Sequence, residues 1–441
     1  MRVALIGNIN NNSYLIAKFL RRKGVEADVF IYDYDYWMAA PEWEEGVFDI
    51  KIVPSLYPKW SWVPLNNNWI RPSWVKTVPP LTWHRLPYAK ADPFIEQMEW
   101  RLNEVLKRRQ HRIVNESLRR RGLPELDFAQ ACQYFDIYRW EKIIAGYDIV
   151  QVCGLDAIHC LLEYPRKTYI VYDIGGPLRS QVWKDSPLDT LLRAAYKNAD
   201  GVIITNPDTR ESAERLGIKN YTFIPSPVDE AKFCPGESRL RKELEAKYGQ
   251  NIVVLFAPGR HDWEVKGTDK ILKAFTRLKK QAQVKVILIA VEWAKDALKA
   301  REFAEKENLG SDILWIRPLN RTALVDYYRA ADVVLDQFVL GTYGKAAREA
   351  MACAKPVIGY FVPELHKWCH SEMPPFCSAQ DEEGIYMWLI NLVHDPQLRQ
   401  EYGQRSRRWI EKYNGWEQVA SSYINLYTLL WDQRRASRGR L

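Results

Sequence analysis

The strongest constraint on the fold is an alternation of two kinds of segment along most of the chain. Short apolar runs rich in β-branched residues are followed by polar or glycine-rich turns, and then by segments with helical periodicity. This alternation predicts parallel sheets with helices on both faces. In the first half, strands are expected at residues 3–8, 27–34, 147–154, 169–176 and 201–206, with a helix at 13–25.

The alternation restarts after a proline-marked stretch at 224–238. Five more strands are expected, with helices between them. The strands are at 252–259, 286–292, 313–318, 333–338 and 356–361, and the helices at 268–280, 294–307, 321–331 and 344–352. We therefore predict an α/β protein of two doubly wound, Rossmann-like domains that face each other across a cleft, where ligands bind beyond the carboxyl ends of the strands.

The restart also predicts the domain boundaries. The N-terminal domain is expected to span 1–235 and to carry an insertion at about 54–121, which is rich in tryptophan at first and then basic. The second domain is expected at 236–412. Residues 413–441 are expected to form a helix that packs back on the N-terminal domain and ends in a basic tail.

The composition narrows the class of protein. Hydrophobic residues make up 47% of the 441, which excludes a disordered chain. The apolar runs have the length of a strand, far short of the ~20 residues that span a bilayer, and residues 1–6 are too short for a secretory signal. Seven scattered cysteines without a Cys-x-x-Cys pair are typical of reduced thiols. We therefore expect a cytoplasmic protein, and the net charge of +8 does not require a nucleic-acid partner.

A loop that opens the second domain carries two cations. Gly259 ends the expected strand, Arg260 and Lys266 follow on the loop, and Thr268 is placed to cap the next helix. Cations beside the amino end of a helix suit a diphosphate, because charge-assisted contacts and backbone N–H groups converge there. An exposed loop with two solvated cations would have the same spacing, so the spacing alone leaves both interpretations open.

A second segment, residues 336–358, runs from a buried strand through a glycine-rich turn into a helix. The backbone amides near 342–345 are placed to hold phosphate. Glu349 follows about one and a half turns later among small apolar residues, where accepting hydrogen bonds from ribose hydroxyls is its natural role. The competing interpretation is a surface glutamate on an amphipathic helix.

These two segments resemble glycosyltransferase family 4, retaining enzymes with the GT-B fold. The family has a Gly-Arg…Lys-Gly loop, and then Glu-x7-Glu leading into Ala-Met-Ala and Pro-Val. Residues 259–267 and 349–357 match this pattern, and 206–235 resembles the family's end of the first domain. The resemblance implies that Arg260 and Lys266 neutralise the donor diphosphate and stabilise it as it leaves, while Glu349 binds the donor ribose.

The resemblance assigns further residues to the site. On the donor side it implies contacts from the strand end at 259, the glycine-rich turn and the turn that cradles the base. In the first domain it implies a loop that approaches the sugar phosphate and the acceptor. The donor-side residues are Gly259, Gly341, Thr342, Tyr343, Gly344, Arg317 and Leu319, and those of the first-domain loop are Gly7, Asn8, Asn11 and Asn12.

Two positions depart from the family pattern. The first glutamate of Glu-x7-Glu is Gly341 here, so recognition of the donor sugar is expected to differ, with Thr342, Tyr343 or Asp336 compensating. The family's active-site histidine aligns near Asp173. An aspartate does not reproduce a neutral imidazole donor, but it can bind a sugar hydroxyl, and we predict Asp173 as a catalytic residue with Arg260 and Lys266.

The resemblance implies a retaining glycosyltransferase. It would move a sugar from a nucleotide-sugar donor to a glycan or lipid-linked acceptor in the synthesis of cell-surface polysaccharide or glycoconjugates. No cofactor or metal is expected, because the leaving phosphate assists deprotonation of the acceptor, and His366-x3-His370 lacks the glutamate of a zinc-protease motif. The alternatives are a non-catalytic nucleotide- or glycan-binding relative, and a phosphorylase or nucleotide-sugar 2-epimerase of the same fold.

The positive charge is concentrated in two places. Residues 101–121 hold eight arginines and lysines against two glutamates, and 433–441 adds four arginines. A basic helix beside a tryptophan-rich loop predicts peripheral contact with an anionic membrane surface or a lipid-phosphate acceptor. A solvated basic helix with a disordered tail is the alternative.

Overall fold

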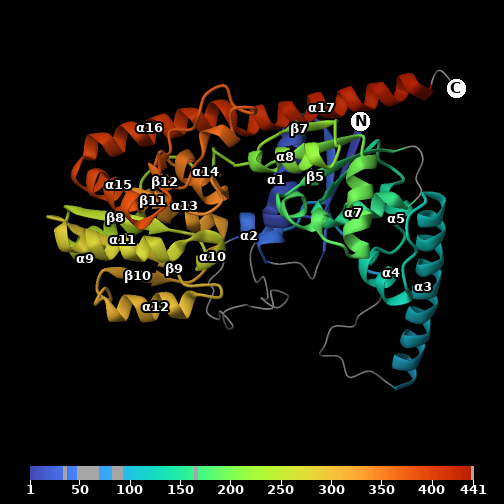
Figure 1. Cartoon of the computed structure of the whole chain (residues 1–441), viewed down its shortest axis with the longest axis horizontal. Helices are drawn as coiled ribbons and strands as arrows, with labels where there is room; N and C mark the ends of the chain where they lie inside the picture. Colours follow the sequence, from blue (N-terminus) through green and yellow to red (C-terminus); the bar gives the residue numbers. More distant parts are fainter. Residues whose placement is uncertain (33–36, 47–68, 82–92, 163–166, 439–441) are drawn as a thin grey trace. The chain divides into compact units, whose positions relative to one another are not determined.

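The computed structural model describes residues 1–32, 37–46, 69–81, 93–162 and 167–438 (Figure 1). The chain forms two compact units, each built on its own parallel sheet. This architecture confirms the predicted pair of doubly wound domains. Unit 1 comprises Met1–Asp35, Pro72–Pro225 and Ala420–Leu441, and unit 2 comprises Tyr36–Arg71 and Ser226–Val419.

Unit 1 has a seven-stranded sheet in the order β3-β2-β1-β4-β5-β6-β7, and all of its strand pairs are parallel. Five strands were expected, and the two additional ones, β3 and β7, lie at the two edges. The strands are β1 (Arg2–Ile6), β2 (Glu26–Ile31), β3 (Val75–Thr77), β4 (Ile149–Cys153), β5 (Thr168–Asp173), β6 (Gly201–Ile204) and β7 (Tyr221–Phe223). The helices are α1 (Asn12–Arg22), α3 (Pro93–Arg120), α4 (Phe128–Tyr134), α5 (Trp140–Ile144), α6 (Gly176–Arg179), α7 (Pro187–Asn198) and α8 (Arg210–Arg215).

Unit 2 has a six-stranded parallel sheet in the order β10-β9-β8-β11-β12-β13. The strands are β8 (Ile252–Ala257), β9 (Lys285–Val291), β10 (Ile313–Ile316), β11 (Val333–Leu335), β12 (Val357–Gly359) and β13 (Cys377–Ser378). The helices are α2 (Pro41–Glu45), α9 (Arg239–Tyr248), α10 (Trp263–Lys266), α11 (Thr268–Gln281), α12 (Ala297–Lys306), α13 (Arg321–Ala330), α14 (Lys345–Ala352), α15 (Glu382–His394) and α16 (Pro396–Tyr413). The last helix, α17 (Trp416–Arg438), begins in unit 2 and continues into unit 1.

Strand β8 shows why the unit 2 sheet is covered on both faces. Successive side chains of a strand point to opposite faces. Val253, Leu255 and Ala257 pack into one hydrophobic cluster, whereas Ile252, Val254 and Phe256 pack into another. Because both sets are buried, the strand reads as one continuous apolar run, as expected for a parallel sheet between two helical layers.

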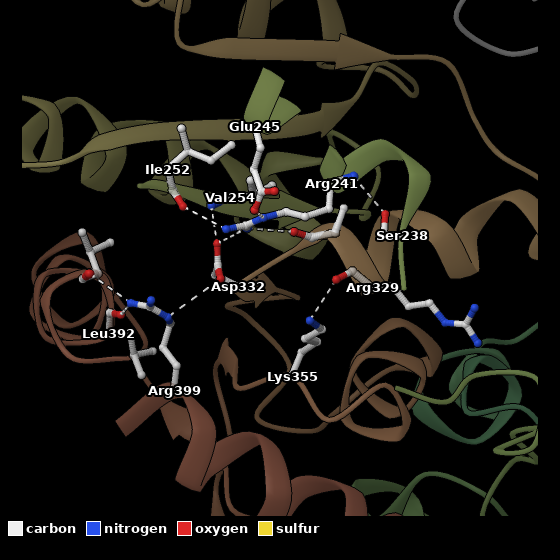
Figure 2. A network of polar contacts seen from close by, with 12 residues as sticks. Ser238, Arg241, Glu245, Ile252, Val254, Arg329, Asp332, Lys355, Leu392 and Arg399 are labelled. Atoms are coloured by element: carbon white, nitrogen blue, oxygen red, sulfur yellow. Dashed lines mark hydrogen bonds and ion pairs between the residues drawn. The ribbon is translucent and has the colours of Figure 1, made fainter. Parts of the chain in front are cut away.

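A polar network closes the amino ends of two central strands of unit 2 (Figure 2). Asp332, directly before β11, accepts hydrogen bonds from Val254 N at 2.8 Å and from Arg241 Nη1 at 2.6 Å. Arg241 also binds Glu245 on its own helix, α9, at 2.7 Å. Arg399 of α16 approaches Asp332 to 4.0 Å and donates to the carbonyl of Leu392 at 2.5 Å. The network thus ties two helices to the sheet at the end away from the predicted ligand site.

The basic helix expected around residues 101–121 belongs to α3, and the helix expected at 413–441 is α17. The unit 1 part of α17 is fixed by a hydrogen bond from Tyr427 Oη to Gln151 Oε1 at 2.6 Å and by an ion pair of Arg434 with Asp200 at 2.9 Å. None of the helices in the described part of the chain is long and apolar enough to cross a bilayer.

Part of the aromatic insertion differs from its expected place. All of 1–235 was expected in the first domain, whereas Tyr36–Arg71 belongs to unit 2. The physical reason is that α2 packs on α13. Trp74, by contrast, stacks on Tyr14 of α1 with ring centroids 5.2 Å apart, so its ring packs within unit 1. Trp60, Trp62 and Trp83 lie outside the described residues.

Candidate functional site

The two predicted phosphate segments meet at the carboxyl ends of the unit 2 strands. Phe338 N, after β11, donates to the carbonyl of Lys266 at 2.9 Å. A β-carbon added to Gly259, after β8, would lie 3.8 Å from the carbonyl oxygen of Asp336. The loop after β8 and the glycine-rich turn after β11 are therefore in contact, at the edge of the sheet where open α/β sheets bind ligands.

Arg260 is held in place but keeps its guanidinium accessible. Its side chain is 40% exposed, and Nη2 lies 3.4 Å from Asp262 Oδ2. Its Nε is buried and has no hydrogen-bond partner among the described residues. Lys266 ends α10, and the following Gly267, at φ +65°, is the N-cap of α11, so Thr268 is the first helical residue rather than the expected cap. This loop therefore offers an unsatisfied donor and a partly exposed positive charge to an anion.

Two side chains of the glycine-rich turn anchor it to histidines that follow β12. Thr342 Oγ1 lies 3.2 Å from His366 Nε2, and Tyr343 Oη lies 2.8 Å from His370 Nε2. Both side chains are buried and support the turn, and their contact with the donor stays a prediction. Gly344 N donates to Asp336 Oδ2 at 3.0 Å, so this amide is already engaged.

Gly341 is a position that a side chain cannot easily occupy. Its φ is +64°, and an added β-carbon would lie 2.9 Å from Val362 Cγ2. Both the left-handed backbone and the close neighbour favour glycine here. The conformation of this turn therefore favours glycine at the position where the family has the first glutamate of Glu-x7-Glu.

Glu349 is fully buried on α14, which excludes the surface interpretation. Its Oε2 accepts hydrogen bonds from Arg321 Nη1 at 2.8 Å and from Tyr328 Oη at 3.1 Å. Its Oε1 is buried and has no hydrogen-bond partner among the described residues. A buried carboxylate oxygen without a donor is costly unless a ligand supplies one, and a sugar hydroxyl is such a donor.

The turn after β10 lies at the same end of the sheet. Arg317 is exposed, whereas Leu319 is half-buried against the core of unit 2. Asn320 then caps α13 by accepting from Ala323 N at 2.9 Å. The contact of Arg317 and Leu319 with the donor base stays a prediction.

His261, next to Arg260, is a residue that sequence analysis missed. It is buried, its ring lies 5.5 Å from that of Trp315, and neither ring nitrogen has a hydrogen-bond partner among the described residues. Burial lowers the pKa of His261 to about 4. The sequence places His261 beside Arg260, the cation predicted to bind phosphate, but the burial of its ring depends on the tertiary structure.

The low pKa of His261 predicts that the folded protein loses stability in acid. Because the unfolded chain has a histidine pKa near 6.5, it takes up a proton before the folded state does, and stability falls as pH drops from about 6.5 towards 4. A His261→Phe variant should lose less stability over that interval, by roughly 3 kcal/mol. The measurement is denaturant unfolding of both proteins at several pH values. Equal pH dependence would contradict the assignment, and other histidines cancel in the difference.

In unit 1, the predicted loop after β1 is a tight turn stabilised by its own asparagines. Asn8 Nδ2 donates to Asn11 Oδ1 at 2.8 Å, and Asn8 Oδ1 accepts from Tyr14 N at 2.9 Å. Gly7 has φ +79°, and an added β-carbon would lie 2.4 Å from Asp156 Oδ2. Asn12 Oδ1 is buried without a hydrogen-bond partner among the described residues. The side chains of Asn8 and Asn11 thus form the turn, and Asn12 is the better candidate for a ligand contact.

Asp173, predicted as a catalytic residue, is enclosed by its own hydrogen bonds. It is fully buried at the end of β5, where Oδ1 accepts from Tyr196 Oη and Oδ2 from Gly175 N, both at 2.8 Å. Burial raises its pKa to about 6, against the opposing effect of these hydrogen bonds. Oδ2 thus holds the turn that follows the strand and Oδ1 ties the strand to α7, and a catalytic contact of Asp173 stays a prediction.

Comparisons with known proteins relate part of unit 2 to a family. Residues 238–409 match the family model of glycosyl transferases group 1. A D-inositol 3-phosphate glycosyltransferase 2 of Catenulispora acidiphila is 24% identical over 222 residues, which are 48% of this chain and 51% of the relative. The chain thus spans about half the length of that curated relative.

Two solved structures show the same fold. Sucrose-phosphate synthase of Thermosynechococcus elongatus has a TM-score of 0.61 at 17% identity, covering 98% of this chain and 100% of that one. HepE of Anabaena, solved with UDP and glucose, has a TM-score of 0.62 at 12% identity, covering 97% and 99%. Unit 2 of this chain therefore carries a domain of the group 1 glycosyltransferase family, and the chain has the GT-B fold.

Proposed function

We propose that the protein is a retaining glycosyltransferase that moves a sugar from a nucleotide-sugar donor to a glycan or lipid-linked acceptor. The observation that carries the proposal is the unsatisfied Oε1 of the buried Glu349, at the end of the sheet that also presents Arg260. The family match over residues 238–409 also supports binding of a nucleotide sugar at the carboxyl ends of the unit 2 strands.

In the proposed reaction, the residues of unit 2 bind and neutralise the donor. Oε1 of Glu349 accepts a hydrogen bond from a ribose hydroxyl, while Arg260 and Lys266 bind the diphosphate. Negative charge develops on the diphosphate as the bond to the sugar breaks, so preorganised cations stabilise the transition state more than the ground state. The acceptor proton passes to the leaving phosphate, so the chain need not supply a nucleophile.

The test is a panel of nucleotide sugars incubated with the protein and candidate acceptors, with products identified by mass spectrometry. UDP-glucose is a first donor because HepE was solved with UDP and glucose, and an inositol phosphate is a first acceptor because of the name of the Catenulispora relative. A new glycoside with the donor's anomeric configuration supports the proposal. Inversion contradicts the retaining mechanism, and nucleotide binding without transfer in any pair favours the non-catalytic alternative, which Gly341 and the enclosed Asp173 motivate.

We further propose that α3 contacts an anionic membrane surface. Its carboxyl-terminal half is anchored, since Val114 and Leu118 are fully buried. Its amino-terminal half instead exposes apolar side chains, with Trp100 66% and Val105 63% exposed, beside exposed arginines. Apolar and cationic groups on one helix are what an anionic membrane surface binds.

Co-sedimentation with phosphatidylglycerol vesicles at low salt should capture the protein, because each cation near the surface adds attraction that salt screens. Replacing Trp100 and Val105 together by Ser should release it. Phosphatidylcholine vesicles are the control. Equal binding to both lipids, or none to either, would contradict the membrane proposal without touching the transferase proposal.

A further inference from the structure

A pocket of about 160 Å³ lies in unit 1, between α17 and the amino ends of β4 and β5. Its strand side includes Asp148, directly before β4, and Thr168, the first residue of β5. Its helix side consists of Trp431, Arg434 and Arg435. The predicted acceptor loop follows the opposite, carboxyl end of β1, and the six residues of β5 alone extend over about 17 Å. The pocket is therefore remote from the loop that is predicted to approach the acceptor.

The α17 residues present a cation and an aromatic ring to the pocket. Because they are spaced by three and four positions, Trp431, Arg434 and Arg435 lie on one face of the helix. The guanidinium carbon of Arg435 lies 4.9 Å from the centroid of the Trp431 ring, and Arg435 is exposed. A guanidinium held over a ring keeps the N–H donors in its plane available to a ligand. The pocket thus combines an accessible cation with an apolar surface.

The walls of the pocket are fixed by contacts within the chain. Arg434 pairs with Asp200 at 2.9 Å, and Asp200 Oδ2 also accepts a hydrogen bond from Tyr169 N at 2.8 Å. Lys167 Nζ, on the strand side, donates to the carbonyl of Ala145 at 2.8 Å. Because the first two contacts tie α17 to β5, little conformational freedom is lost when a ligand enters the pocket.

The inner end of the pocket carries a hydroxyl group without a partner. Thr168 is 1% exposed, the lowest value among the residues that line the pocket. Its Oγ1 is buried and has no hydrogen-bond partner among the described residues. Leaving a buried hydroxyl unsatisfied is costly, and an oxygen atom of a ligand would remove that cost.

Asp148 discriminates between classes of ligand. Its side chain is 40% exposed, and its Oδ2 accepts a hydrogen bond from Arg2 N at 2.7 Å. A carboxylate repels a bare anion, but it accepts hydrogen bonds from hydroxyl groups. The cation of Arg435 and the carboxylate of Asp148 together favour a ligand that carries both an acidic group and hydroxyl groups.

The volume of the pocket limits the size of this ligand. A cavity of about 150 Å³ holds one benzene molecule, so the pocket has room for one six-membered ring. We propose that it binds one anionic sugar unit, with the acidic group at Arg435, the ring against Trp431 and a hydroxyl at Asp148. This second carbohydrate site adds to the proposed function, because a sugar bound here is too far from the carboxyl end of the sheet to react there.

The test measures the affinity of four small probes by ligand-observed NMR titration at pH 7 and low ionic strength. D-Glucuronate and D-glucose 6-phosphate are the anionic sugars, D-glucose is the neutral sugar, and acetate is the anion without a ring. The tighter anionic sugar should bind at least about tenfold more tightly than glucose or acetate, since it alone satisfies both the cation and the hydroxyl acceptor. Which of the two is tighter distinguishes an acidic residue of a glycan from a sugar phosphate.

Two substitutions locate the bound probe. Arg435→Gln removes the exposed cation and should weaken the tighter probe about tenfold, and Trp431→Leu should have a similar effect. Arg215→Gln and Trp183→Leu are the matched controls. Arg215 is exposed and lies 3.6 Å over the ring of the half-buried Trp183 in the same unit, and neither residue lines the pocket. Both controls should leave the affinity unchanged.

The proposal is overturned if glucose or acetate binds as tightly as the tighter anionic sugar, if none of the four probes binds at millimolar concentration, or if Arg435→Gln leaves the affinity unchanged. Binding that falls with Arg260→Ala instead places the sugar in the donor site and also overturns it. Should Trp431→Leu fail to fold, Arg435→Gln decides alone, because replacing an exposed side chain leaves stability nearly unchanged. Sugar transfer enters none of these measurements, so a failure of the pocket and a failure of the proposed function are separate results.

Discussion

Replacing Arg260 with alanine should lower kcat/KM for sugar transfer by about 10²–10³. The guanidinium is partly exposed at the carboxyl end of the sheet, and its buried Nε has no hydrogen-bond partner among the described residues. A bound diphosphate would supply that partner. Because charge grows on the diphosphate as it leaves, most of the loss should fall on kcat rather than on KM.

Arg277→Ala is the matched control for this measurement. Arg277 has a similar exposure, 47% of its side chain, and is paired with Glu383 on the surface of the same unit. Its replacement should leave kcat/KM and the unfolding midpoint unchanged. Lys266→Ala and Glu349→Ala should resemble Arg260→Ala in activity. Near-normal transfer in all three variants would contradict the donor-site assignment.

The regular part of the fold was predictable because its signals are local. The helix expected at 268–280 is α11, Thr268–Gln281, and the strand expected at 252–259 contains β8. The three strands that were missed, β3, β7 and β13, are short and lie at or next to a sheet edge, where too few residues alternate to leave a pattern. β3 also follows a stretch rich in proline and tryptophan, which reads as a loop.

The candidate site was predictable only where motif and geometry coincide. Arg260 and Glu349 stand in short motifs, and the structure gives each an unsatisfied atom. Thr342 and Tyr343 stand in the same motif, yet their side chains bind histidines more than twenty positions later. Nothing local to a motif reveals which way a side chain points.

Glu44 marks the limit of sequence reasoning here. It lies 301 positions before Lys345 in the sequence, and no spacing rule connects them. Its neighbours in sequence are apolar and acidic residues, and none of them predicts a place among three cations, Lys232, Arg321 and Lys345. The contact depends on the docking of α2 on α13, which is a property of the tertiary structure alone.

Asp332→Ala should destabilise unit 2 by about 3 kcal/mol, because removing one partner of a buried ion pair leaves the other charge uncompensated. Arg241 is only 24% exposed and would lose its closest carboxylate, and Val254 N would lose its acceptor. Glu237→Ala breaks an ion pair whose partners are 69% and 86% exposed, so it should leave the unfolding midpoint unchanged. The measurement is denaturant unfolding, fitted as two transitions because the chain has two compact units. Only one transition should move with Asp332→Ala. A shift as small as that of Glu237→Ala would mean that the network in Figure 2 follows from the fold of unit 2 without stabilising it.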